Sequence, residues 1–75
     1  MARSQSTEIL AEMVANVLVV PCEVGDTIAQ GDTVILLESM KMEIPVLTEE
    51  AGTVSEIKVE VGDVVQEGDI LAIID

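Results

Sequence analysis

Few side chains in this sequence are suited to covalent chemistry. It has no histidine and one cysteine, Cys22, and its only cationic side chains are Arg3, Lys41 and Lys58. Without histidine, the usual zinc, haem and His-assisted nucleophile sites cannot be assembled. The glycine-containing turns lack the Lys and Ser/Thr of a phosphate-binding loop, and the paired aspartates lack calcium-loop spacing. We therefore expect a non-catalytic protein without a metal site.

The amine of Lys41 is the most informative of these groups. The segment around it, residues 38–43, reads ESMKME. Taken alone, this segment has the composition of a helix ended by Pro45, because it contains no Gly, Pro, Asn or Asp. An isolated lysine is also most often a solvated surface residue without a specific role. Which interpretation holds depends on the elements that position the segment.

An internal repeat decides between these interpretations. Residues 24–32 (VGDTIAQGD) align with residues 61–69 (VGDVVQEGD) at an offset of 37, and the same offset pairs Val17 with Val54 and 33–38 with 70–75. Each Gly-Asp pair is a turn signal, since glycine permits positive φ and aspartate can bond to the nearby backbone. Turns this close together leave room for short strands and little room for helices.

Apolar residues alternate with others at 20–24 and 57–61, which predicts strands with one buried face. We predict strands near residues 8–12, 16–23, 27–30, 33–39, 42–47, 52–60, 64–67 and 70–75. Two four-strand half-repeats bury their apolar faces most economically against each other. The predicted fold is therefore all-β, a flattened eight-stranded barrel-sandwich hybrid with internal quasi-twofold symmetry.

In this fold Lys41 lies where the first half-repeat crosses into the second. A quick reversal there predicts a two-residue hairpin centred on Met40 and Lys41. Both residues of such a turn need positive φ, which ordinarily selects Asn-Gly and costs other side chains about 1 to 3 kcal/mol. An unfavourable turn of this kind indicates that the lysine is present for a function.

The charge of the chain excludes two classes of partner. The formal net charge is -12, with 15 acidic residues against three basic ones. Nucleic acid and anionic membrane surfaces should repel such a protein. The sequence also has no apolar run approaching ~20 residues and no secretory signal at its start, so we expect a cytoplasmic protein.

The motif ESMKME resembles the biotin-attachment motif of biotin carboxyl carrier proteins, which centres on Met-Lys-Met. The resemblance covers residues 8–75 as a biotinyl domain and leaves residues 1–7 as a flexible N-terminal tail. It implies that biotin is linked through an amide to Lys41, with Met40, Met42, Ser39 and Glu38 recognised by partner enzymes. Two departures are Ser39, where many carriers have alanine, and Ala15, where the repeat suggests glycine.

The resemblance also implies the function of the domain and its partner enzymes. It implies a substrate of biotin protein ligase, monomeric on its own, whose biotin carries a carboxyl group from a biotin carboxylase to a carboxyltransferase. The short polar start is typical of a free-standing carrier or of an excised domain. Two alternatives stay open: a lipoyl domain, whose tip resembles Asp-Lys rather than Met-Lys-Met, and an unmodified structural domain of the same fold.

Overall fold

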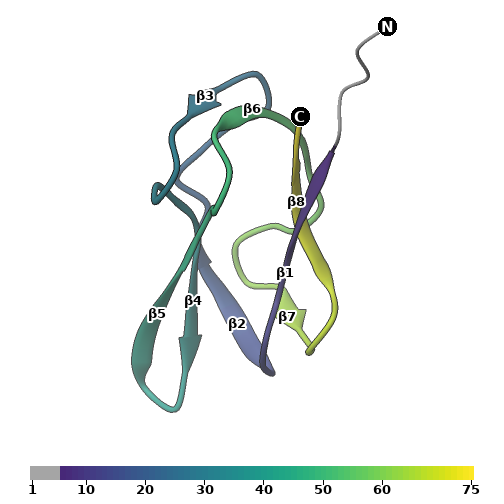
Figure 1. Ribbon diagram of the computed structural model, residues 1–75. Coiled ribbons are helices and arrows are strands. Elements are labelled where there is room, and N and C mark those ends of the chain that lie inside the picture. Colours follow the sequence, from purple (N-terminus) through teal and green to yellow (C-terminus); the bar gives the residue numbers. More distant parts are fainter. Residues whose placement is uncertain (1–5) are drawn as a thin grey trace, which may run out of the picture.

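The computed structural model describes residues 6–75, which form eight β-strands and no helix, and therefore no helix that could span a membrane (Figure 1). The strands are β1 Thr7–Leu10, β2 Ala15–Val19, β3 Thr27–Ile28, β4 Thr33–Ser39, β5 Met42–Leu47, β6 Gly52–Ile57, β7 Val64–Val65 and β8 Ile70–Ile74. All eight predicted strands are confirmed: those predicted over 33–39 and 42–47 have the predicted bounds, and the other six end earlier than predicted. Of the predicted tail, residues 1–5 lie outside the described residues, and Thr7 begins β1.

The strands form two antiparallel sheets with the orders β1-β8-β6-β3 and β5-β4-β2-β7. The offset of 37 residues relates β1, β8, β6 and β3 to β5, β4, β2 and β7, in that order. The two sheets therefore have equivalent strand orders, which confirms the predicted quasi-twofold symmetry. Hydrogen bonds follow it closely: Gly25 N–H donates to the Val54 carbonyl and Gly62 N–H to the Val17 carbonyl, both at 2.8 Å. The architecture is a sandwich of two sheets, as expected from the repeat.

The space between the sheets is filled by small aliphatic side chains. Among residues 6–75, fourteen apolar residues are buried: Ile9, Ala11, Ala15, Val17, Cys22, Ile28, Val34, Ile35, Leu37, Val54, Val65, Leu71, Ala72 and Ile74. They form one cluster shared by both half-repeats. Branched aliphatic residues fit this narrow layer and have the stiff side chains that strands favour.

The predicted burial of two valines is wrong. Val24 is 62% exposed and Val61 is 65% exposed, although they belong to the alternating stretches 20–24 and 57–61. Both stretches leave the β-ladder before these valines, because each valine immediately precedes a Gly-Asp turn. Val20 and Val59, which lie nearer the strands, do pack against the core.

Aspartate side chains close the four turns in the same way. The carboxylate of Asp26 accepts a hydrogen bond from the Glu23 N–H, and that of Asp63 accepts one from the Glu60 N–H, each at 2.9 Å. Asp32 and Asp69 make the equivalent bonds in the other two turns. The glycine before each aspartate has a φ between 91° and 99°. The turn chemistry predicted for the Gly-Asp pairs is therefore confirmed.

Gly52 is required for a different reason, namely the close approach of another strand. A Cβ atom at this position would lie 2.4 Å from the Asp75 carbonyl oxygen and 2.8 Å from the Ile74 side chain. The neighbouring backbone is fixed there, since Thr53 and Asp75 exchange two hydrogen bonds of 2.9 and 2.8 Å. Only a residue without a side chain fits between β6 and the end of β8.

Replacing Gly52 by alanine is therefore expected to lower the free energy of unfolding by about 1 to 3 kcal/mol, the usual cost of overpacking. Urea unfolding followed by circular dichroism measures this change. The exposed neighbour Thr53→Ala is the control and should stay within about 0.5 kcal/mol of the parent protein. An unchanged urea midpoint for Gly52→Ala would show that the strands can separate there at little cost.

Candidate functional site

The turn between β4 and β5 contains the lysine. Ser39 pairs with Met42, so Met40 and Lys41 are the two turn residues, with φ values of 53° and 66°. Two consecutive residues in the left-handed region are the signature of a type I′ hairpin. They are the only non-glycine residues with positive φ in residues 6–75. The predicted two-residue hairpin, with its unfavourable residues, is confirmed.

The tip of this hairpin is open to solvent. The side chain of Met40 is 91% exposed, that of Met42 is 62% exposed, and Lys41 is also exposed. Large apolar side chains at this level of exposure are not contributing to the core. They form an apolar, adaptable surface on both sides of the amine, suited to contact with another protein.

The hairpin lies at one end of an elongated molecule. The principal extents are 45 × 19 × 18 Å, and the β4–β5 turn projects from the end opposite the described chain ends (Figure 1). At that opposite end the Ser6 hydroxyl donates a hydrogen bond to Asp75. The offset of 37 relates Ser6 and Asp75 to Glu43 and Glu38, so Ser6 and Asp75 occupy the place symmetry-related to the base of the hairpin.

The base of the hairpin is held in a fixed register. β4 and β5 pair along their whole length, from Thr33 opposite Leu47 to Ser39 opposite Met42. Leu37 is 1% exposed, and its partner Ile44 packs against the core. Because these residues secure the strands a few positions from the turn, the amine is presented on a rigid support.

The charges near the tip come mainly from a cross-strand acidic pair. Glu38 lies directly opposite Glu43, one residue pair below the turn. Within residues 6–75 the one salt bridge joins Lys58 to Glu56, so the amine of Lys41 makes no ion pair there. Like charges placed opposite each other destabilise a hairpin slightly. The pair therefore favours contact with a positively charged group on another molecule.

The structure brings all the sequence-predicted site residues together. Lys41 and Met40 form the turn, while Glu38, Ser39 and Met42 occupy the strand ends that enter and leave it. These residues form a protruding tip and not a cavity. A protrusion is suited to entering the active site of another protein, whereas it provides no enclosed space for a substrate.

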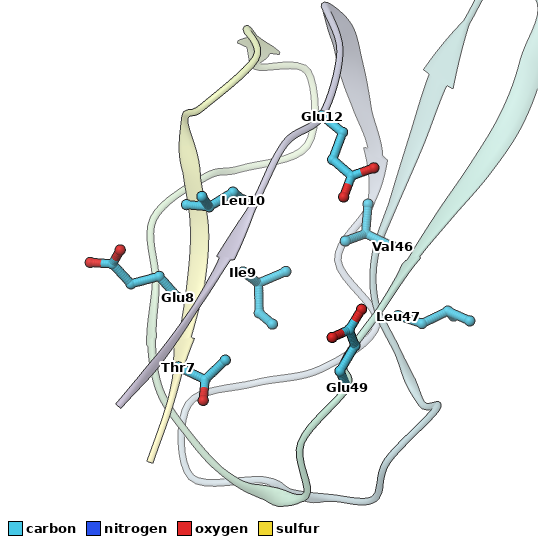
Figure 2. Close-up of a pocket in the computed structure, with 8 residues that line it drawn as sticks. All are labelled: Thr7, Glu8, Ile9, Leu10, Glu12, Val46, Leu47 and Glu49. Carbon is cyan, nitrogen blue, oxygen red and sulfur yellow. The ribbon is translucent and has the colours of Figure 1, made fainter. Parts of the chain in front are cut away.

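A separate hollow lies between the edge strands β1 and β5 (Figure 2). It is lined by Thr7, Glu8, Ile9, Leu10, Glu12, Val46, Leu47 and Glu49. The lining contains carboxylates and aliphatic side chains but no thiol or amine. Lys41 does not line it, so this hollow is not part of the lysine site.

Cys22 is also excluded as a reactive group. Its side chain is 6% exposed, and its thiol donates a hydrogen bond to the Val34 carbonyl at 3.4 Å. Burial raises the pKa of the Cys22 thiol, and the negative charge of Asp26 raises it further. A buried thiol that stays protonated is a poor nucleophile, so Cys22 serves as a small core residue.

Comparison with known proteins relates this arrangement to biotin. The family described as biotin-requiring enzyme matches residues 5–74. Biotinylated protein TB7.3 of Mycobacterium tuberculosis and its homologue in Mycolicibacterium smegmatis are each 62% identical to this chain over 40 residues. The aligned segment covers 53% of this chain and 56% of each relative, so the match spans about half of these proteins.

Solved structures extend the similarity to the whole fold. The urea carboxylase of Kluyveromyces lactis superimposes with a TM-score of 0.90 and 31% identity, over 100% of this chain and 7% of that one. A single-chain, multi-domain long-chain acyl-CoA carboxylase superimposes with a TM-score of 0.87 and 25% identity, over 97% of this chain and 7% of that one. This chain is thus similar to one small part of each carboxylase.

The strained turn leads to a stability prediction. Met40→Asn should raise the free energy of unfolding by about 0.5 to 1 kcal/mol, because asparagine tolerates the left-handed conformation better than methionine. Met42→Asn is the matched control: position 42 lies in β5 without positive φ, and asparagine is a poor strand residue, so stability should fall. Urea midpoints of the two variants test this, and equal losses would contradict the strain at Met40.

Proposed function

Since this chain belongs to the biotin-requiring enzyme family, we propose that it is a biotin carrier domain and that Lys41 is its attachment site. The observation that supports this most strongly is the type I′ turn, in which an exposed lysine occupies a position with a φ of 66°. Glycine or asparagine would form this turn at lower cost. The strain is accounted for if the amine itself is the functional group.

The residues of the tip fit covalent attachment of biotin. The amine of Lys41 is exposed and makes no ion pair within residues 6–75, so a ligase can reach it without first breaking one. In the loading reaction, Lys41 Nζ forms an amide bond with the carboxyl carbon of biotin and loses two protons. ATP is cleaved to pyrophosphate and AMP, and AMP retains the oxygen lost from the carboxyl group.

Biotin held by Lys41 would supply the chemistry of carboxyl transfer, between a biotin carboxylase and a carboxyltransferase. The residues of this chain contribute position and not catalysis. The paired strands β4 and β5 hold Lys41 at the far end of the molecule, away from Ser6 and Asp75. A carrier bound near both active sites therefore presents its side chain to each of them at a high effective concentration.

The partners of the domain belong to the same proposal. The relatives are described as biotinylated proteins, and the similar structures are carboxylases, which supports a role beside carboxylase partners. Biotin protein ligase, biotin carboxylase and carboxyltransferase are the three enzymes that such a carrier must contact. The cytoplasm, which supplies ATP for loading, is the proposed location.

Intact mass tests the attachment site. After incubation with biotin, ATP and a biotin protein ligase, the protein should gain the mass of one biotinyl group, and Lys41→Arg should gain none. Lys58→Arg is the matched control, because it removes the other lysine in the described chain while leaving the hairpin unchanged. Lys58→Arg should accept biotin like the parent protein.

Three results would contradict the proposal. A gain in mass that survives in Lys41→Arg but disappears in Lys58→Arg would move the attachment site to Lys58, which follows β6. No gain in the parent protein, with a lipoate ligase succeeding in its place, would make the chain a lipoyl-type carrier. Failure with both ligases would indicate an unmodified structural domain.

A further inference from the structure

The outer face of the lysine-bearing sheet contains an apolar row. Leu36 lies between two fully buried residues of β4 and therefore points away from the core. Its partners across the sheet are Pro45 on β5 and Val19 on β2. Pro45 is exposed and Val19 is 43% exposed. Pro45, Leu36 and Val19 thus form a continuous row across three strands, here called the apolar row.

The second half-repeat provides an internal comparison. The offset of 37 relates Pro45, Leu36 and Val19 to Glu8, Ile73 and Glu56. These residues also form one row, since Ile73 pairs with Glu8 on one side and with Glu56 on the other. Both glutamates are exposed. In the symmetry-related row, the apolar side chain of Ile73 thus lies between two exposed carboxylates.

The two rows share one backbone geometry and differ in chemistry. The Glu8–Ile73–Glu56 row has an apolar side chain only at its centre, so the fold does not require apolar residues at the two flanking positions. The apolar row lies on the sheet that also bears the lysine hairpin (Figure 1). Pro45 and Val19 are exposed apolar residues whose counterparts are glutamates, which indicates a contact surface.

We propose that the apolar row is a docking surface for the biotin protein ligase that modifies Lys41. This inference rests on the proposed function and adds to it the surface by which the ligase is recognised. Leu36 is four residues from the start of the turn at Met40, or ~13 Å at the rise of a strand. Standard interfaces bury roughly 800 Å² on each partner, a patch roughly 30 Å across, so one enzyme can cover the tip and the row together.

The charges between the tip and the row define the chemistry of the partner surface. Glu38 and Glu43 lie two residue pairs from Leu36 and Pro45 toward the turn, on the same outer face of the sheet, because the pair between them, Leu37 and Ile44, points inward. A complementary surface therefore offers an apolar patch and, two residue pairs closer to the turn, an arginine or lysine. Such a cation would relieve the repulsion between the two carboxylates.

The ligase is a better occupant than the carboxylase partners for a geometric reason. The ligase must bring its active site to Lys41 Nζ itself, which requires close approach to the hairpin backbone. Carboxylase partners act at the far end of biotin, which adds its own length to the lysine side chain. A surface ~13 Å behind the turn is consequently within reach of an enzyme that takes in the hairpin tip.

Transferring the charged pattern of the second half-repeat tests this proposal. The variant Val19→Glu/Pro45→Glu places glutamates where the symmetry-related row has Glu56 and Glu8, an arrangement that this backbone already accommodates. The control, Val24→Glu/Val61→Glu, adds the same charge at two exposed valines that lie beside Gly-Asp turns, away from the apolar row. Leu36→Thr is a second variant, which reduces the apolar surface without adding charge.

The measurement is the steady-state rate of biotinylation by a biotin protein ligase with biotin and ATP, as a function of carrier concentration. We expect Val19→Glu/Pro45→Glu to raise KM about tenfold, equivalent to ~1.4 kcal/mol of binding, with kcat within about twofold. Leu36→Thr should raise KM to a lesser degree, and the control should leave it unchanged. Circular dichroism establishes that each variant is folded.

Two results would overturn the docking surface. The first is an unchanged KM for folded Val19→Glu/Pro45→Glu. The second is an equal increase in the Val24→Glu/Val61→Glu control, which would assign the effect to net charge. Absence of any biotinylation of the parent protein would overturn the proposed function as well, whereas normal modification of all variants would overturn the docking surface alone.

Discussion

Pairing between the two half-repeats is the interaction on which the rest of the structure depends. Four of the six strand pairs, β1–β8, β2–β7, β3–β6 and β4–β5, join one half to the other. Each sheet therefore takes two strands from each half, and all of them contribute to a single aliphatic core. A chain of 75 residues with no aromatic side chain is near the lower size limit for an unstapled domain. Sharing one core between the halves allows so small a chain to bury enough apolar surface.

The same pairing places the stabilising core and the lysine-bearing turn in different parts of the molecule. The core lies between the sheets, while the β4–β5 turn extends beyond it at one end of the 45 Å axis. Met40 and Lys41 can therefore adopt a strained turn without disturbing core packing. The paired strands hold the strained turn in place, because Leu37 and Ile44 pack into the core a few residues from it. A rigid protrusion of this kind suits a carrier, because its reactive group must enter the active sites of other proteins.

Departures from the internal symmetry coincide with the proposed functions. The place related to the base of the lysine hairpin is occupied by Ser6 and Asp75, which are joined by a hydrogen bond. The face related to Pro45, Leu36 and Val19 is flanked by glutamates. Where the halves agree, as in the four aspartate-closed turns, the residues serve the fold. The repeat thus helps to distinguish side chains kept for folding from those available for recognition.

Much of the fold could be predicted from the sequence, because its signals are local and occur twice. The Gly-Asp turns, the eight strands and the Met40–Lys41 hairpin follow from turn chemistry and from the offset of 37. The lysine motif indicated biotin for the same reason, since its residues are contiguous. The alternation of apolar residues wrongly predicted that Val24 is buried, because the sequence does not show where the chain leaves the β-ladder.

Only the tertiary structure determines which side chains form the outer face of the lysine-bearing sheet. A bulge between Val17 and Val19 changes which residues of β2 face outward, so that Val19 joins Leu36 on the exposed side while Val17 is buried. A shift of one residue reverses the face of every side chain after it. Sequence periodicity does not reveal such a shift, because it appears only when the partner strand is in place. The sequence determined the strands and the lysine, and the cross-strand register determined which side chains surround it.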